Sequence, residues 1–244
     1  MTPVIWRPVK AQTLAIVLKR AIEGGAVPLG DKLWVWRCCG KCSQPLQIHY
    51  TAGRGGPSGV LRQYVRCRKC EDCYRARRLH WTFRAGIEFA RAPRTWLLTL
   101  TLKPEEHMVL NYRADLKYRR LTGNSLLTVS TVEQFPFLAG EGFLLITKYF
   151  KRLRKNTNST LRYMVTAEAH KSGLPHYHAL VHETTSAITK RQFQENWKHG
   201  FSNAKLVLEP KACAYVAKYI NKANAGRVRA SLAYGKYPQG RLSA

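Results

Sequence analysis

Apolar and polar residues alternate in three stretches of the chain, which we interpret as β-strands. Residues 95–102 place Trp96 and Leu98 on one side and mostly threonines on the other. Residues 163–169 and 176–182 alternate in the same way, and turn-forming residues separate them. Side chains two apart in a strand share a face, so these last two stretches predict a β-hairpin with one apolar and one polar face.

Apolar residues recur at helical spacing in five other stretches, which predict α-helices over residues 9–23, 71–90, 143–155, 189–199 and 210–223. Two shorter β-like pieces, 46–50 and 61–65, flank a glycine-rich loop and predict a second, smaller hairpin. Residues 103–140 carry only weak patterns and predict no particular role. The order of elements after residue 95 favours an α+β domain with an antiparallel sheet.

Composition changes the picture by naming a partner. The 244 residues include 41 Lys and Arg against 14 Asp and Glu, a formal charge of +27, while 45% are hydrophobic. Such a charge would make the compact state repel itself unless a polyanion binds, and nucleic acid is the leading candidate. No run approaches the roughly 18 apolar residues that span a bilayer, and no signal peptide is evident, so we expect an intracellular protein with no membrane partner.

The charge is concentrated near the C-terminus. No acidic residue follows Glu209, whereas seven lysines and arginines do. We expect this segment to lie near phosphate groups, or otherwise to be a solvated basic tail.

The polar face of the predicted hairpin carries candidate metal ligands. Glu168 shares its face with Thr166, and His176 and His178 lie on the matching face of the second strand. Two imidazoles and one carboxylate leave positions open on a divalent ion, which can then polarise a phosphate oxygen; Mg²⁺ or Mn²⁺ is expected. His170 and His182 are weaker candidates. Alternatively, these histidines are ordinary strand residues or donors to DNA phosphate.

The helix predicted over residues 210–223 carries candidate nucleophiles. Tyr215 and Tyr219 are four residues apart, and Lys218 and Lys222 each follow a tyrosine by three, so all four share one side. A phenol with its usual pKa near 10 is a poor nucleophile, but nearby ammonium groups favour phenolate and offset charge on a phosphate. Alternatively, the tyrosines belong to the apolar stripe of a packed helix.

Six of the seven cysteines lie between residues 38 and 73. They include two Cys-x-x-Cys pairs, Cys39 with Cys42 and Cys67 with Cys70, whose spacing is compatible with one structural Zn²⁺. Cys38 and Cys73 are additional, and Cys73 can replace one of the four. Free thiols in a reducing compartment are the alternative.

Three motifs resemble those of a known family in their order. Trp96-Leu-Leu-Thr-Leu-Thr, Pro175-His-Tyr-His-Ala-Leu-Val and Tyr215-Val-Ala-Lys-Tyr-Ile-Asn-Lys are similar to motifs of the HUH endonucleases, the rolling-circle replication initiators, and most of all to those of microvirus-type phages. The run Cys67-Arg-Lys-Cys-Glu-Asp-Cys also resembles one that precedes the first motif in such phage proteins. The resemblance extends over about residues 67–235.

The resemblance implies a central five-stranded antiparallel sheet flanked by helices, here preceded by a zinc-ribbon-like module. It implies that His176, His178 and Glu168 bind the metal and that Tyr215 and Tyr219 are the nucleophiles. The expected partners are single-stranded DNA at a replication origin and a host helicase and polymerase, in the cytoplasm of a bacterial host. We expect residues 1–75 to form the cysteine module, 76–225 the endonuclease domain and 226–244 a basic tail.

The expected activity is therefore metal-dependent nicking and rejoining of single-stranded DNA through a covalent 5′-phosphotyrosine. Two other functions fit the same residues. A transposase or plasmid relaxase with this chemistry would usually need one tyrosine, and a zinc-ribbon protein that binds nucleic acid without catalysis would need neither tyrosine nor histidine.

Overall fold

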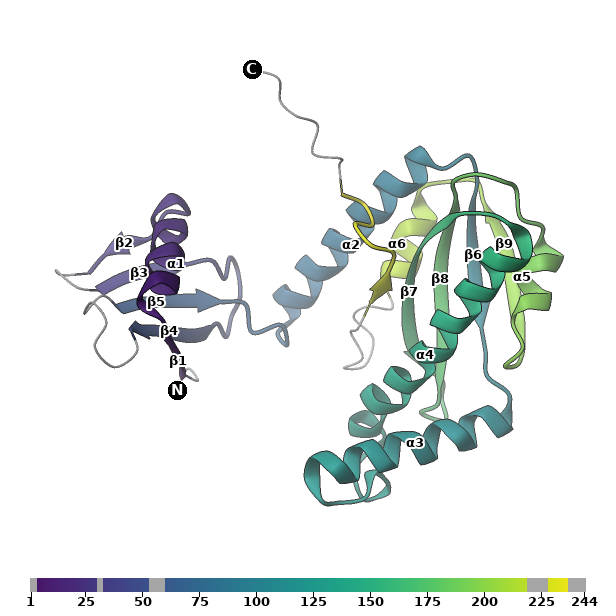
Figure 1. The fold of residues 1–244 in the computed structure, drawn as a ribbon, viewed down its shortest axis with the longest axis horizontal. Helices are drawn as coiled ribbons and strands as arrows, with labels where there is room; N and C mark the ends of the chain where they lie inside the picture. The colour runs from purple at the N-terminus through teal and green to yellow at the C-terminus, as the bar shows by residue number, and fades with distance from the viewer. Residues whose placement is uncertain (1–3, 30–32, 53–59, 219–227, 237–244) are drawn as a thin grey trace. The chain divides into compact units, whose positions relative to one another are not determined.

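A computed structural model describes residues 4–29, 33–52, 60–218 and 228–236. The chain divides into two compact units, residues 1–76 and 77–244, and each contains a five-stranded sheet (Figure 1). None of the described helices is both long and apolar enough to cross a bilayer.

The first unit is a mixed sheet with one helix. Its strand order is β1 (Val4–Val9), β4 (Leu46–Ala52), β5 (Val60–Val65), β3 (Leu33–Arg37) and β2 (Val27–Pro28), and its helix is α1 (Ala11–Glu23). The helix and the β4–β5 hairpin agree with the pattern of the sequence, and that hairpin is antiparallel. The pairing of β1 with β4 and of β3 with β5 is parallel, so this unit has more sheet than a zinc ribbon requires.

The second unit has the α+β architecture expected from the sequence. Its sheet runs in the order β10 (Arg229–Ala230), β7 (Leu161–Ala169), β8 (Pro175–Glu183), β6 (Thr95–Leu100) and β9 (Ser202–Val207), and every neighbouring pair is antiparallel. Strand alternation sends two apolar sets to opposite faces, where they form two separate cores.

Helices cover both faces of this sheet. The larger core lies under α3 (Pro104–Thr122), α4 (Thr131–Thr157) and α5 (Lys190–Asn196), with a short 3-10 helix, Leu126–Thr128, between the first two. The smaller core lies under α2 (Glu71–Arg91) and α6 (Lys211–Lys218). The residues that can do chemistry lie on this second face.

Residues 103–140 are mostly helical, although the sequence pattern there is weak. Pro104 takes the first position of α3, where its missing N–H costs nothing, and Gly123 ends that helix in the left-handed conformation. Ser130 begins α4 with a capping box to Glu133, and Pro136 lies inside the helix. Residues that usually interrupt helices here lie mainly at helix ends, which explains why the pattern is hard to interpret.

A notch in α4 fixes the central strand. Tyr177, between the two histidines of β8, points to the opposite face and is fully buried. Its hydroxyl donates to the Ala139 carbonyl at 3.2 Å. A Cβ at Gly142 would overlap that hydroxyl, so only glycine leaves room for the phenol.

Residues 228–236, which we expected in a basic tail, belong to the second unit. β10 extends the sheet beside β7, and Tyr234 is fully buried in the smaller core. Arg84 on α2 donates to the Tyr234 carbonyl at 2.6 Å, and Glu88 accepts from the Gly235 N–H. This segment thus closes over the end of α2.

Candidate functional site

The β7–β8 register brings the predicted triad together. Glu168 is directly opposite His176, and His178 is opposite Thr166, two residues along on the same face. Glu168 Oε2 lies 3.1 Å from His176 Nε2 and 3.0 Å from His178 Nε2. The three side chains form a group whose ligand atoms all lie within 4.8 Å of one another.

The donor set of the triad fits a divalent cation. Two ligand atoms bound at right angles about 2.1 Å from one ion are about 3 Å apart, which matches both Glu–His separations. The Thr166 hydroxyl beside the triad is buried and has no hydrogen-bond partner among the described residues. A buried polar atom in this state is what a water or an ion can satisfy.

A threonine on the neighbouring strand orients one imidazole. Thr99 on β6 is paired with His178, and its Oγ1 lies 3.4 Å from His178 Nδ1. If Nδ1 carries the proton and donates to this hydroxyl, Nε2 is left as a metal ligand. Sequence alternation put Thr99 on a polar face, but only the pairing of β6 with β8 reveals its partner.

The two weaker histidine candidates lie outside this group of three. His170 follows the end of β7, and its Nδ1 lies 3.4 Å from the Ser172 hydroxyl. His182 is fully buried, with Nδ1 2.8 Å from Thr95 Oγ1 and Nε2 2.7 Å from the Tyr234 hydroxyl. Glu168 is therefore the third member of the group with His176 and His178.

Helix α6 packs on the same sheet face as the triad. Cys213 and Val216 are buried against Met164 and Leu180, which fixes the rotation of the helix. Tyr215 lies outside this buried stripe and is 43% exposed, unlike a packed core tyrosine. The predicted residues Tyr219 and Lys222, and the side chain of Lys218, lie outside what the structure describes.

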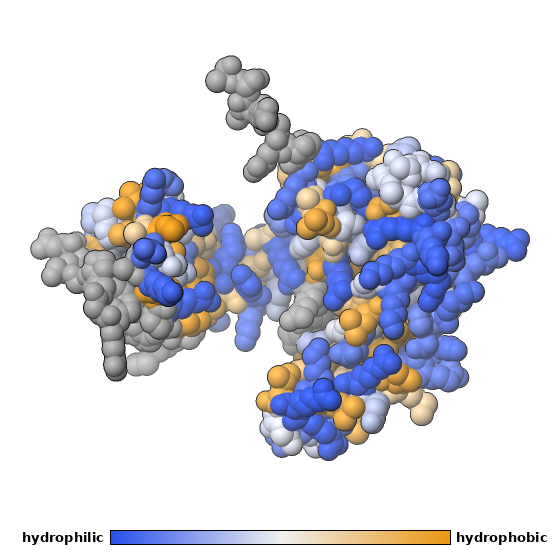
Figure 2. All heavy atoms as spheres, viewed as in Figure 1, coloured by the Kyte–Doolittle hydropathy of each residue, from blue (hydrophilic) through white to orange (hydrophobic). Residues whose placement is uncertain are grey.

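The basic helix predicted over residues 143–155 lies within α4, on the opposite face of the sheet. Its apolar side packs in the larger core, and Lys148, Lys151 and Lys155 are exposed. Hydrophilic side chains dominate the side of the second unit visible in Figure 2. These lysines cannot contact a phosphate held at the triad, because the sheet separates them from it.

The structure forms a cysteine group with one member different from the expected set. Cys42, Cys67, Cys70 and Cys73 have sulfur atoms within 4.8 Å of one another, and Cys39 is not part of this group. The first turn of α2 brings Cys73 inward. The Cys42–Cys70 and Cys67–Cys73 sulfur separations, 3.7 and 3.9 Å, match the edge of about 3.8 Å that a tetrahedral Zn²⁺ with 2.3 Å bonds requires.

The local backbone favours thiolate at some of these sulfurs. The Cys73 N–H and the Ser43 side chain lower the pKa of Cys70 to about 5. Burial raises the pKa of Cys67, but the Lys69 and Cys70 N–H groups outweigh this effect and lower it overall. Burial raises the pKa of Cys73 to about 12, so this thiol needs a metal to lose its proton.

Comparisons with known proteins identify a replication-associated family for part of the chain. Residues 141–224 match a family model described as a replication-associated protein of the ORF2 type. This span includes the β7–β8 hairpin and α6. It therefore covers the triad and Tyr215 and supports a role in replication initiation.

One solved structure is similar at low level. It is the N-terminal nuclease domain of non-structural protein 1 from minute virus of mice, with 13% identity and a TM-score of 0.28 over 69% of this chain and 75% of that one. A TM-score this low carries no argument about fold or activity. A search of curated proteins finds no match.

Proposed function

We propose that this protein starts rolling-circle replication by nicking single-stranded origin DNA through a tyrosyl-phosphate intermediate and then rejoining strands. One observation carries the proposal: the Glu168–His176–His178 group and the exposed Tyr215 lie on the same face of one sheet. The family match over the same residues supports it. Single-stranded DNA is the partner that the charge of +27 favours.

The proposed reaction exchanges one phosphoester for another. A divalent cation such as Mg²⁺ or Mn²⁺ held by the triad would polarise the scissile phosphate. The Tyr215 oxygen bonds to phosphorus, the bond to the 3′ oxygen breaks, the phenol loses its proton and the 3′ oxygen gains one. Lys218 and Lys222 would offset charge on the phosphate. The products are a 5′-phosphotyrosine and a 3′ hydroxyl that a host polymerase can extend.

A second tyrosine would give the reaction its second half. With Tyr215 holding the first 5′ end, Tyr219 can cut the regenerated origin, and the released 3′ hydroxyl can attack the first phosphotyrosine to close a circle. Because each step replaces one phosphoester by another, no external energy source is needed. A host helicase would separate the strands ahead of the polymerase.

An adduct assay tests this function. Labelled single-stranded DNA from the protein's own replicon with Mn²⁺ should give an SDS-resistant adduct, and EDTA should abolish it. The Tyr215→Phe and Tyr219→Phe double variant should give none, whereas Tyr112→Phe, at an exposed position on α3, should react normally. An adduct in the double variant would show that the nucleophile assignment is wrong. Metal-independent binding without any adduct would favour a non-catalytic DNA-binding protein.

We also propose that the cysteine group binds one structural Zn²⁺. The structure favours Cys73 over Cys39 as the fourth ligand because only Cys73 has its sulfur in the group. Cys73→Ser should therefore lower the zinc content from one equivalent to well below one, as measured by a chromogenic chelator after denaturation, while Cys39→Ser should retain it. Equal zinc loss in the two variants would contradict this ligand set.

A further inference from the structure

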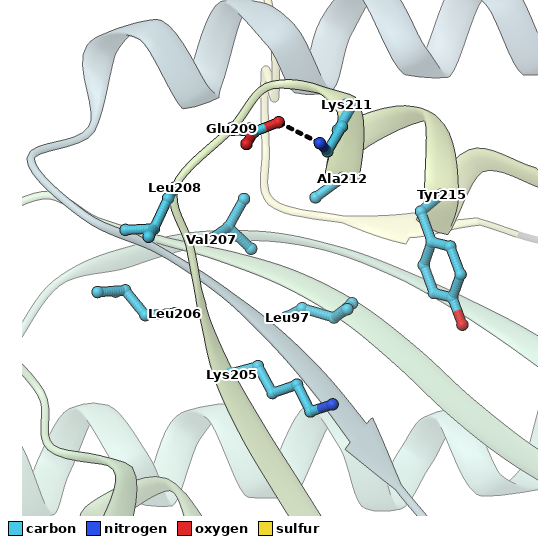
Figure 3. A pocket seen from close by; sticks show the side chains of 9 residues that line it. All are labelled: Leu97, Lys205, Leu206, Val207, Leu208, Glu209, Lys211, Ala212 and Tyr215. Carbon is cyan, nitrogen blue, oxygen red and sulfur yellow. Dashed lines mark ion pairs between the residues drawn. The ribbon is translucent and has the colours of Figure 1, made fainter.

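A pocket opens between α6 and the edge of the sheet. Its volume is about 720 Å³, within the range of small-molecule sites. Leu97 from β6 and Val207 from β9 contribute sheet residues, and Ala212 and Tyr215 contribute from α6. In Figure 3 the Tyr215 ring extends from α6 at one end, away from the Glu209–Lys211 ion pair.

The pocket lies on the same face as the triad. Leu97 and Val207 pack against the smaller core, as α6 does. Leu97 is two residues along β6 from Thr99, whose hydroxyl lies beside His178. Two residues of strand extend about 7 Å, so the pocket begins within one nucleotide of extended single strand from the Thr99–His178 pair.

The lining combines three chemical features. Leu206 and Leu208 add exposed apolar surface, and Leu208 is 81% exposed. Tyr215 presents an aromatic ring, and Lys205 brings an ammonium group on an exposed side chain. A ligand that is flat and apolar but carries a negative charge satisfies all three, and a nucleotide has this chemistry.

We propose that this pocket binds the base of a nucleotide next to the scissile phosphate, with the base against the Tyr215 ring and the leucines and a backbone phosphate near Lys205. The location beside the cut rests on the proposed function. The carboxylate in the lining, Glu209, is already paired with Lys211, so no free acid in the pocket reads a base edge. Binding is therefore driven by stacking and apolar contact and tolerates different bases.

Two DNA probes of equal charge test the proposal. We would measure by fluorescence anisotropy, in EDTA, the dissociation constants of a labelled strand of eight thymidines and of the same strand made entirely of abasic residues. Both strands carry the same phosphates, so the ratio of the two constants isolates the contribution of the bases. Wild-type protein should prefer the thymidine strand by at least tenfold.

Variants then locate this preference. Ala212→Phe fills the pocket and should reduce the ratio about tenfold; Leu208→Ser, an exposed position where folding is not at risk, should reduce it about threefold. Leu127→Ser, at a similarly exposed leucine on the 3-10 helix, should leave it unchanged. Unchanged ratios in folded Ala212→Phe and Leu208→Ser proteins would overturn the proposal, including the case in which the exposed leucines serve a protein partner.

The adduct assay separates this proposal from the proposed function. Wild-type protein that forms the adduct, together with pocket variants whose binding ratio is unchanged, would refute the base site alone. Wild-type protein that forms no adduct, together with variants that lose the thymidine preference, would refute nicking while leaving a base-binding pocket.

Discussion

His178 and His182 occupy equivalent positions on β8 but have different surroundings. They are four residues apart on one face, and each is paired with a threonine of β6 that lies near its Nδ1. The difference is at Nε2. In His178 this atom faces the Glu168 carboxylate, whereas in His182 it meets the buried Tyr234 hydroxyl.

This difference shows that a histidine's role here is decided by the neighbour of its far nitrogen. A carboxylate beside a second imidazole makes a cation site, and a phenol inside a core makes a structural hydrogen bond. Glu88 and Arg162, which form an ion pair near His182, act on its charge but do not change its role. The comparison leads to three predictions, from the largest effect to the smallest.

Replacing His178 should have the largest effect, and only on chemistry. His178→Ala removes one of three metal ligands and should lower the rate of adduct formation by about 10³-fold, with little change in melting temperature. The rate is measured with Mn²⁺ and origin DNA on denaturing gels. His170→Ala, outside the group of three, is the matched control and should retain activity. A His178→Ala protein that reacts normally would remove the metal role from this histidine.

Replacing His182 should change the pH dependence of stability. Burial lowers the pKa of His182 from 6.5 to about 4, so the native state binds fewer protons than the unfolded state. Stability should therefore be greatest above pH 6.5 and fall as the pH drops toward 4, by about 3 kcal/mol from this residue.

His182→Gln cannot titrate and should flatten this part of the profile. The measurement is urea unfolding followed by tryptophan fluorescence between pH 7 and 4.5, and subtracting the two profiles removes carboxylates common to both proteins. Parallel profiles would mean that His182 is already protonated in the folded protein.

Replacing Thr99 should give the smallest effect. Thr99→Val keeps the shape but removes the hydroxyl that orients His178, and it should weaken Mn²⁺ activation about tenfold, as loss of an outer hydrogen bond typically does. The concentration of Mn²⁺ for half-maximal adduct formation reports this change. Thr99→Ser should restore it, and if Ser and Val behave alike, the hydroxyl has no orienting role.

The parts of the site set by strand alternation could be predicted from the sequence. Faces alternate with a period of two, so Glu168, His176 and His178 had to lie on one side once the hairpin was recognised. Partners that depend on pairing between distant strands could not be predicted. Thr99 and Tyr234 are of this kind, because local sequence does not tell which strand β6 or β10 joins.

The cysteine ligands and the missing strands have other physical causes. Several cysteines lie close in sequence, and only the first turn of α2 decides that Cys73 rather than Cys39 reaches the group. Strand β9 ends the sheet and is exposed at Lys205 and Leu206, so its alternation is weak. The central sheet, whose strands are covered on both faces, carries the strongest signal.

The glycine notch in α4 also links two distant positions in heredity. A side chain at position 142 would collide with the phenol at position 177, and that phenol separates the two histidines. Homologues that gain bulk at the first position should therefore lose it at the second, and a lineage that changes only one of the two should shift the histidine pair and pass on a poorer enzyme.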